Sequence, residues 1–214
     1  MKILNLYSGI GGNRKLWCKQ HQVTAVEINP EIANIYSAFF PMDKVIVGDA
    51  HKYLLKHIKE FDFIWSSPPC PTHSKMRIAG IKVKTHPHKL SYPDMALYQE
   101  IIFLKHFSNK NTKWTVENVQ PYYEWLIKPT AIVGRHCFWT NFYIQQKGIK
   151  DEAESVAYVH KNDERFGFSI QGAPLESMGK HPEKPLTNLV NPEIGLYLLE
   201  QAQKGVKPLF NFTY

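Results

Sequence analysis

The chain has 214 residues, 43% of them apolar and 21% charged, so it can bury a full core and its composition excludes disorder. It contains no apolar stretch long enough to span a bilayer, and its start lacks the segments of a signal peptide, so we expect a cytoplasmic protein. Three cysteines without a CxxC pair suggest neither a disulfide framework nor a structural zinc site. The formal charge of +7 favours a polyanionic partner.

The first half of the chain alternates β-rich runs with amphipathic stretches, a pattern typical of βαβ units around a parallel sheet. The sequence therefore predicts an α/β fold. The expected strands cover residues 2–7, 23–28, 44–49, 61–67, 114–118, 130–133 and 138–144. The first expected helix begins near residue 14, the second covers 30–40, and a third lies between the third and fourth strands. The remaining three cover 91–108, 121–127 and 192–202.

Two segments do not fit this alternation. Residues 71–90 contain five Lys or Arg, three His and no acid, and they are predicted to form a long loop. Loops of that length are usually functional or disordered. Residues 145–187 contain six basic and seven acidic side chains and are predicted to be irregular.

A glycine-rich turn, Y-S-G-I-G-G, follows the first strand and allows the backbone to approach a ligand closely. A tight connection and the phosphate cradle of a nicotinamide enzyme remain open alternatives for this turn. Glu27 ends the second strand 18 residues after Gly9, where an acid can accept hydrogen bonds from ribose hydroxyls. Asp49 ends the third strand similarly. Helix capping is the alternative for either acid alone, but their repeated placement favours a nucleoside pocket.

The run S-S-P-P-C directly follows the fourth strand and ends at Cys70. Two prolines restrict the chain there, which is an unusual setting for a cysteine that only fills space. The next strand ends in W-T-V-E-N-V, which contains Glu117 and Asn118, and a buried carboxyl group there implies a role unless it caps a helix. A metal site built from Cys70, His73, His86 and His88 is conceivable, although such loop histidines are more often solvated.

Together these motifs resemble the cytosine-C5 DNA methyltransferase family. Its ordered signatures match YSGIGG, Glu27, G-D-A at 48–50, S-P-P-C, E-N-V and N-L-V at 188–190. The specific pair is P-P-C followed by E-N-V, with the glutamate 47 residues after the cysteine. The resemblance implies a Rossmann-like S-adenosylmethionine-dependent methyltransferase fold, with a mostly parallel seven-stranded sheet flanked by helices.

The resemblance also implies the reaction, a transfer of a methyl group from S-adenosylmethionine to carbon 5 of cytosine in DNA. Cys70 would add as a thiolate to carbon 6 of a flipped-out cytosine, and Glu117 would hold the ring nitrogen and the exocyclic amine. Arg135 matches the first arginine of the family's R-x-R motif, although the run here is Arg135, His136, Cys137. The residues implied to contact the donor are Tyr7, Gly9, Gly11, Gly12, Glu27, Asp49 and Asn188.

The chain departs from the family in size, because only residues 145–187 stand where a target-recognition domain is expected. We therefore divide it into a donor-binding catalytic domain at 1–144, a short irregular segment at 145–187 and a helix at 188–214 that completes the catalytic domain. The basic loop is expected to grip DNA phosphates, and a partner protein could supply specificity. The loop residues assigned to this contact are Lys75, Arg77, Lys82 and Lys84.

Two alternatives remain open. Members of the same family methylate transfer RNA, but their C-F-T motif is absent here. A non-catalytic DNA-binding partner subunit could also keep this fold, although intact Cys70 and Glu117 disfavour it. Amino methyltransferases have an aromatic residue where Cys70 stands. A bacterial or phage setting fits, in restriction-modification, epigenetic marking or self-protection of a phage.

Overall fold

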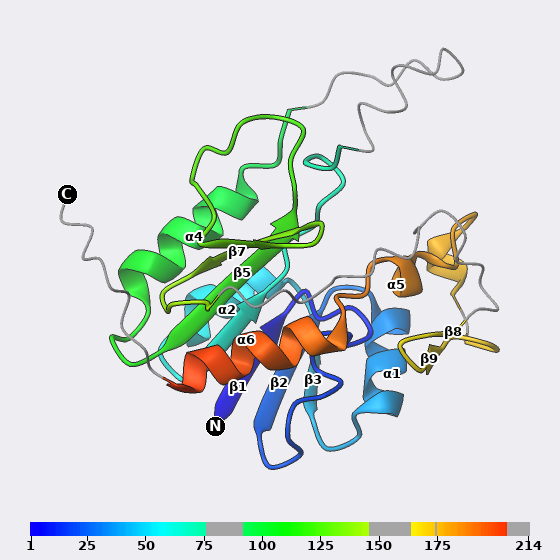
Figure 1. The fold of residues 1–214 in the computed structure, drawn as a ribbon. Coiled ribbons are helices and arrows are strands. Elements are labelled where there is room, and N and C mark those ends of the chain that lie inside the picture. Colours follow the sequence, from blue (N-terminus) through cyan, green and yellow to red (C-terminus); the bar gives the residue numbers. More distant parts are fainter. Residues whose placement is uncertain (76–91, 146–163, 174, 205–214) are drawn as a thin grey trace.

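A twisted seven-stranded sheet forms the centre of the computed structural model, which describes residues 1–75, 92–145, 164–173 and 175–204 (Figure 1). The strand order is β3-β2-β1-β4-β5-β7-β6. Strands β1 to β5 are parallel to one another, and β7 is antiparallel to both β5 and β6. The strands are β1 (Lys2–Leu6), β2 (Gln22–Glu27), β3 (Lys44–Val47), β4 (Phe63–Ser66), β5 (Lys113–Val119), β6 (Ala131–Val133) and β7 (His136–Thr140).

This strand order confirms the predicted Rossmann-like methyltransferase fold class. The first five positions follow the doubly wound order, in which ligands bind at the carboxyl ends of the strands where the order reverses. That switch point lies between β1 and β4. All seven expected strands are present, and only the last is displaced, because it begins at His136 and ends at Thr140.

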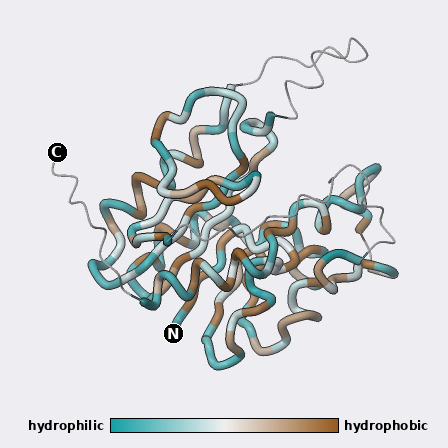
Figure 2. Tube along the Cα trace, viewed as in Figure 1, coloured by the Kyte–Doolittle hydropathy of each residue, from teal (hydrophilic) through white to brown (hydrophobic). Residues whose placement is uncertain are grey.

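Helices cover both faces of the sheet. Apolar residues of α2 (Ala50–His57) and α4 (Ala96–Phe107) pack with Leu4, Leu6 and Val116 on one face. Helix α6 (Pro192–Lys204) packs on the other face with Ile3 and Phe63. Figure 2 shows hydrophobic residues interspersed with polar ones along the strands and helices of this body. The remaining α-helices are α1 (Pro30–Phe39) and the short α5 (Lys184–Thr187).

Two predicted helices are absent. Residues 11–20 form turns instead of the helix expected from about Arg14, because α6 already covers that face: a Cβ on Gly195 would lie 2.1 Å from the Asn13 carbonyl oxygen. Residues 121–127 form bends and not a helix. The helix expected over residues 91–108 is present as the shorter α4, and Met95 and Ile102 in that range are nearly half exposed.

The described part of the 145–187 segment packs against the main body. It contains a hairpin of β8 (Glu164–Arg165) and β9 (Phe168–Ser169), the 3₁₀ helix η2 (Glu176–Met178), and α5. Phe168 and Leu186 form a core cluster with Ile10, which follows β1, and Ile35 of α1. These residues therefore share an apolar core with the glycine-rich turn. Within the described ranges, no helix is both long and apolar enough to cross a membrane.

Candidate active site

Glu27 joins the glycine-rich turn to the end of β2. Its carboxylate accepts hydrogen bonds from the Gly9 N–H at 3.0 Å, through Oε2, and from the Asn29 N–H at 3.0 Å, through Oε1. Glu27 does not cap α1, because the Asn29 side chain does so by accepting from Glu31 N and Ile32 N. Each carboxylate oxygen has a second lone pair, so Glu27 can still accept from a ligand hydroxyl. The side chain is buried and its geometry is fixed.

Gly9 offers the open surface next to Glu27. A Cβ at this position would meet nothing within 4 Å, and the backbone φ of +53° lies in the left-handed region that favours glycine. Ile28, which follows Glu27, is 71% exposed and presents an apolar surface beside it. An unfilled backbone cradle, a buried acceptor and an apolar side chain together fit an adenosine group.

The other two glycines of the turn are required by packing. A Cβ on Gly11 would lie 2.3 Å from the Phe40 ring, and one on Gly12 would lie 2.6 Å from the Val190 carbonyl oxygen. The turn is thus enclosed by α1 on one side and by the segment before α6 on the other. Tyr7 also faces inward, because its hydroxyl donates to Glu100 Oε1 at 3.4 Å.

Asp49 and Asn188 lie at the surface. Asp49 caps α2 by accepting from the Lys52 N–H at 3.0 Å, so the capping role considered for it is present in the structure. Its Oδ2 remains near solvent, with Lys52 Nζ at 3.7 Å. Asn188 follows α5, and its exposed side chain is two residues before Val190, which packs on Gly12. Both side chains are accessible to a ligand at this edge of the sheet.

Cys70 stands on a turn that is anchored from β5. The Asn118 side chain donates from Nδ2 to the Pro68 carbonyl at 2.9 Å, and its Oδ1 accepts from the Val119 N–H at 3.0 Å. The Cys70 carbonyl accepts from His73 N and Ser74 N, which forms one helical turn after the cysteine. Cys70 is therefore held between an anchored proline and a hydrogen-bonded turn.

Burial raises the pKa of the Cys70 thiol, and the negative charge of Glu117 raises this pKa further. The Arg135 guanidinium acts in the opposite direction and lowers the same pKa. The net shift is upward, so the resting side chain is a thiol at neutral pH. Arg135 is thus a cation that lowers the pKa of Cys70, but burial and Glu117 outweigh it.

Glu117 is buried and bonded to a residue that the sequence did not select. Its Oε1 lies 2.6 Å from His136 Nδ1, and Arg135 Nε donates to His136 Nε2 at 3.2 Å. Arg135 Nη2 also donates to the Thr187 carbonyl at 3.2 Å, which ties β7 to the end of α5. The structure thus brings together the three residues assigned to catalysis, Cys70, Glu117 and Arg135, through electrostatic contact and one bridging histidine.

Glu100 is a second buried carboxylate that the sequence did not indicate. It lies on α4, fully buried, and accepts from Ser66 Oγ at 2.9 Å and from the Tyr7 hydroxyl. His51 Nδ1 lies 3.6 Å from it, and the hydrogen bond to Glu100 raises the pKa of His51. Glu100 therefore links the ends of β1 and β4 beneath the switch point. The sequence did contain a signal for this residue, because Glu100 stands among the apolar residues of the expected helix over 91–108.

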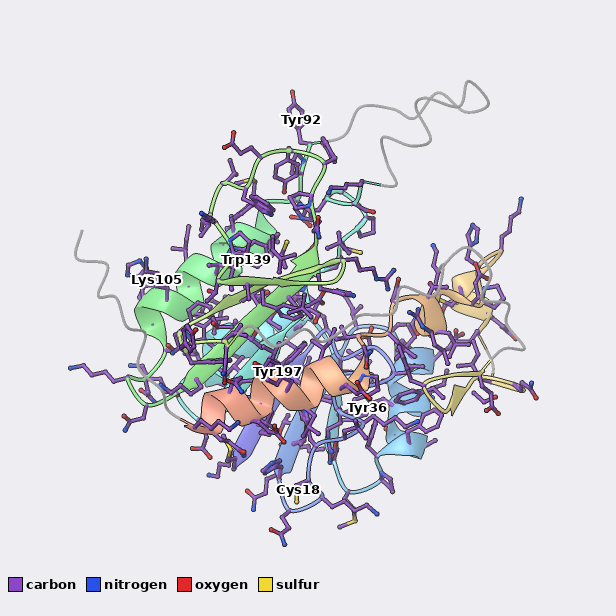
Figure 3. The ribbon with its side chains drawn as sticks, in the orientation of Figure 1. Cys18, Tyr36, Tyr92, Lys105, Trp139 and Tyr197 are labelled. Atoms are coloured by element: carbon purple, nitrogen blue, oxygen red, sulfur yellow. The ribbon has the colours of Figure 1, made fainter. Side chains whose placement is uncertain are left out.

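The nucleic-acid contacts assigned to the basic loop are only partly described. Lys75 is exposed, and its Nζ donates to Gln120 Oε1 at 3.0 Å. Arg77, Lys82 and Lys84 lie outside the described residues, as do His86 and His88 of the conceivable metal site. No cluster of three potential metal ligands occurs in the described ranges. Figure 3 shows Cys18 at the opposite end of the molecule from Tyr92.

Part of the chain is similar to a known protein family. Residues 1–92 match the model of the C-5 cytosine-specific DNA methylase family. The resemblance is confirmed there. This stretch contains the glycine-rich turn, Glu27, Asp49 and the P-P-C turn, whereas Glu117 and His136 lie beyond it. No curated protein matches the chain.

Solved structures give remote likenesses. A SAM-dependent methyltransferase from Agrobacterium tumefaciens is 12% identical with a TM-score of 0.41, and the match covers 57% of this chain and 40% of that one. A candidate DNA modification methyltransferase encoded within an E. coli prophage is 19% identical with a TM-score of 0.38, over 58% of this chain and 33% of that one. The matches thus cover less than half of the length of either solved chain. The fold is established by the strand order alone.

Proposed function

We propose that this chain transfers a methyl group from S-adenosylmethionine to carbon 5 of cytosine in DNA. The observation that carries the proposal is the coupling of Cys70 to Glu117 and Arg135 at the carboxyl edge of the sheet, on a turn anchored by Asn118. The family match over residues 1–92 supports the same chemistry.

The donor fits the cradle beside Gly9. Glu27 would accept from the ribose hydroxyls, Asp49 from the adenine amine, and Ile28 would cover an apolar part of the nucleoside. Asn188 would close the other side of the pocket, next to the glycine-rich turn. When bound, S-adenosylmethionine supplies an electrophilic methyl group.

The residues of the chain then activate the base. The Cys70 thiol must lose its proton before the sulfur can bond to carbon 6 of the cytosine, which makes carbon 5 nucleophilic. Glu117, whose Oε2 accepts no hydrogen bond from a described residue, would hold the ring nitrogen and the amine as charge develops there. After carbon 5 has taken the methyl group, a base removes the carbon-5 proton and the Cys70 sulfur leaves carbon 6 as a thiolate, which restores the aromatic base. The thiolate then takes up a proton and becomes the thiol again.

The activity is tested by sequencing DNA from cells that express the chain, with cytosine methylation read at single-base resolution. We expect new 5-methylcytosine that is absent from cells expressing Cys70→Ser, because a serine hydroxyl is far less ionised than a thiol. Purified enzyme offered DNA and transfer RNA in parallel distinguishes the substrates. Methylation of RNA alone would contradict the DNA assignment, and donor binding without transfer to either would indicate a non-catalytic subunit.

A further inference from the structure

His136 is hydrogen-bonded to Glu117, whose carboxyl group would face the base in the proposed reaction. In the register of β5 and β7, Glu117 lies opposite Phe138, and His136 is two residues away on the same face. His136 is 4% exposed and Glu117 is 6% exposed, so water competes little for their hydrogen bond. The pair lies close to Cys70, whose pKa responds to Glu117.

The partners of His136 fix where its proton lies. The Arg135 guanidinium can only donate, so His136 Nε2 must accept from Arg135 Nε. The neutral imidazole then carries its single proton on Nδ1, and it must donate this proton to Glu117 Oε1. Oε1 is therefore committed as an acceptor. Any proton that Glu117 holds must lie on its other oxygen, Oε2.

We infer that His136 is a positioning residue that orients Glu117 so that Oε2 is the oxygen that gives or holds a proton at the base. This inference rests on the proposed function for its substrate, but the hydrogen-bonded chain from Arg135 through His136 to Glu117 does not. A general acid contributes only when its proton points at the reacting atom, so a misdirected carboxyl group would lose that contribution.

Two substitutions separate positioning from support of the fold. His136→Phe keeps the ring and removes both hydrogen bonds, whereas His136→Asn keeps an N–H at the place of Nδ1 that can donate to Glu117. His57→Asn is the matched control, because His57 also pairs with a glutamate, Glu60 at 2.8 Å, in an exposed contact at the C-terminal end of α2.

The first measurement is the rate at which Cys70 forms a covalent adduct with DNA containing 5-fluorocytosine in the presence of S-adenosylmethionine. We expect His136→Phe to lower this rate about 100-fold with little change in the KM for DNA, and His136→Asn to recover most of it. His57→Asn should react like the wild type. Equal losses in the Phe and Asn variants, or a wild-type rate in His136→Phe, would overturn the inference.

The second measurement is proton NMR of the unliganded protein. We expect a strongly downfield Nδ1 proton signal that disappears in His136→Phe and remains in His57→Asn. Its absence from the wild type would overturn the hydrogen-bonded chain whatever the substrate proves to be. No adduct in a wild type that shows this signal would instead count against the proposed function.

Discussion

Cys70 needs a higher pH to react than an exposed cysteine does. Burial and Glu117 raise its pKa, so the thiolate fraction at neutral pH is small and increases as the pH rises past the ordinary thiol value of about 8.5. We expect alkylation of Cys70 by iodoacetamide to increase through this range. Arg135→Ala should move the curve to still higher pH, because it removes the cation that lowers the pKa.

This alkylation is measured with Cys18→Ser and Cys137→Ala already in place, so that Cys70 is the single reactive thiol. A curve that lies below the ordinary thiol value, or one that Arg135→Ala moves to lower pH, would contradict the electrostatic account of this site.

Glu27 and Asp49 are expected to differ in their effect on donor binding. Glu27→Ala removes a buried acceptor and leaves the Gly9 and Asn29 N–H groups without it, so we expect affinity for the donor to fall at least tenfold. Asp49→Ala removes an exposed helix cap and should cost less affinity, together with about 1 kcal/mol of stability. Calorimetry with S-adenosylhomocysteine measures both affinities. Unchanged affinity in both variants would restrict these acids to structural roles.

At the scale of elements, the turn that carries Cys70 depends on β5 through Asn118. Asn118→Asp keeps the shape and the acceptor for Val119 N, but it cannot donate to the Pro68 carbonyl. We expect both Asn118→Asp and Asn118→Ala to slow adduct formation at Cys70 by at least tenfold while donor affinity stays unchanged. If Asn118→Asp reacts at the wild-type rate, the bond to Pro68 does not position the nucleophile.

Short apolar runs were sufficient to predict the seven strands of the main sheet, since most of them are buried and lie between turn-forming residues, but not the two-residue strands β8 and β9 in the segment predicted to be irregular. The helix expected from Arg14 is absent because α6, which is almost 180 residues away in the sequence, occupies its face of the sheet. Such long-range competition leaves no local signal. The pairing of His136 with Glu117 was missed for a similar reason: it depends on the register of two antiparallel strands. The turn that carries Cys70 was predictable because its residues, S-S-P-P-C at 66–70, are contiguous in the sequence.

Across the whole molecule, the short segment at residues 145–187 is the feature that most distinguishes this chain from the family it resembles. Most of the basic loop, including Arg77, Lys82 and Lys84, lies outside the described residues, and Lys75 is held by Gln120. We expect simultaneous replacement of Lys75, Arg77, Lys82 and Lys84 by Ala to lower the affinity for DNA. The slope of log affinity against log salt concentration should become shallower by about 0.9 for each phosphate contact that is lost. Fluorescence anisotropy at several salt concentrations measures this slope.

A deletion of residues 151–161 is the control for this loop, because it spares Arg165, which donates to the Leu186 and Thr187 carbonyls. It should cost little DNA affinity. With so short a segment in place of a recognition domain, we expect a short or relaxed target unless a partner protein contributes contacts. Methylation by the purified chain of a single site of about six base pairs, with strong discrimination at every position, would contradict this expectation.

The central claim is that Cys70 attacks carbon 6 of a cytosine, and trapping of the adduct tests it most directly. The chain is incubated with S-adenosylmethionine and DNA containing 5-fluorocytosine, digested, and analysed by mass spectrometry. Because fluorine cannot leave as the proton does, the account predicts a nucleotide covalently attached to the peptide that contains Cys70. Attachment at another residue, or methylation of ordinary DNA without any trapped adduct, would contradict it.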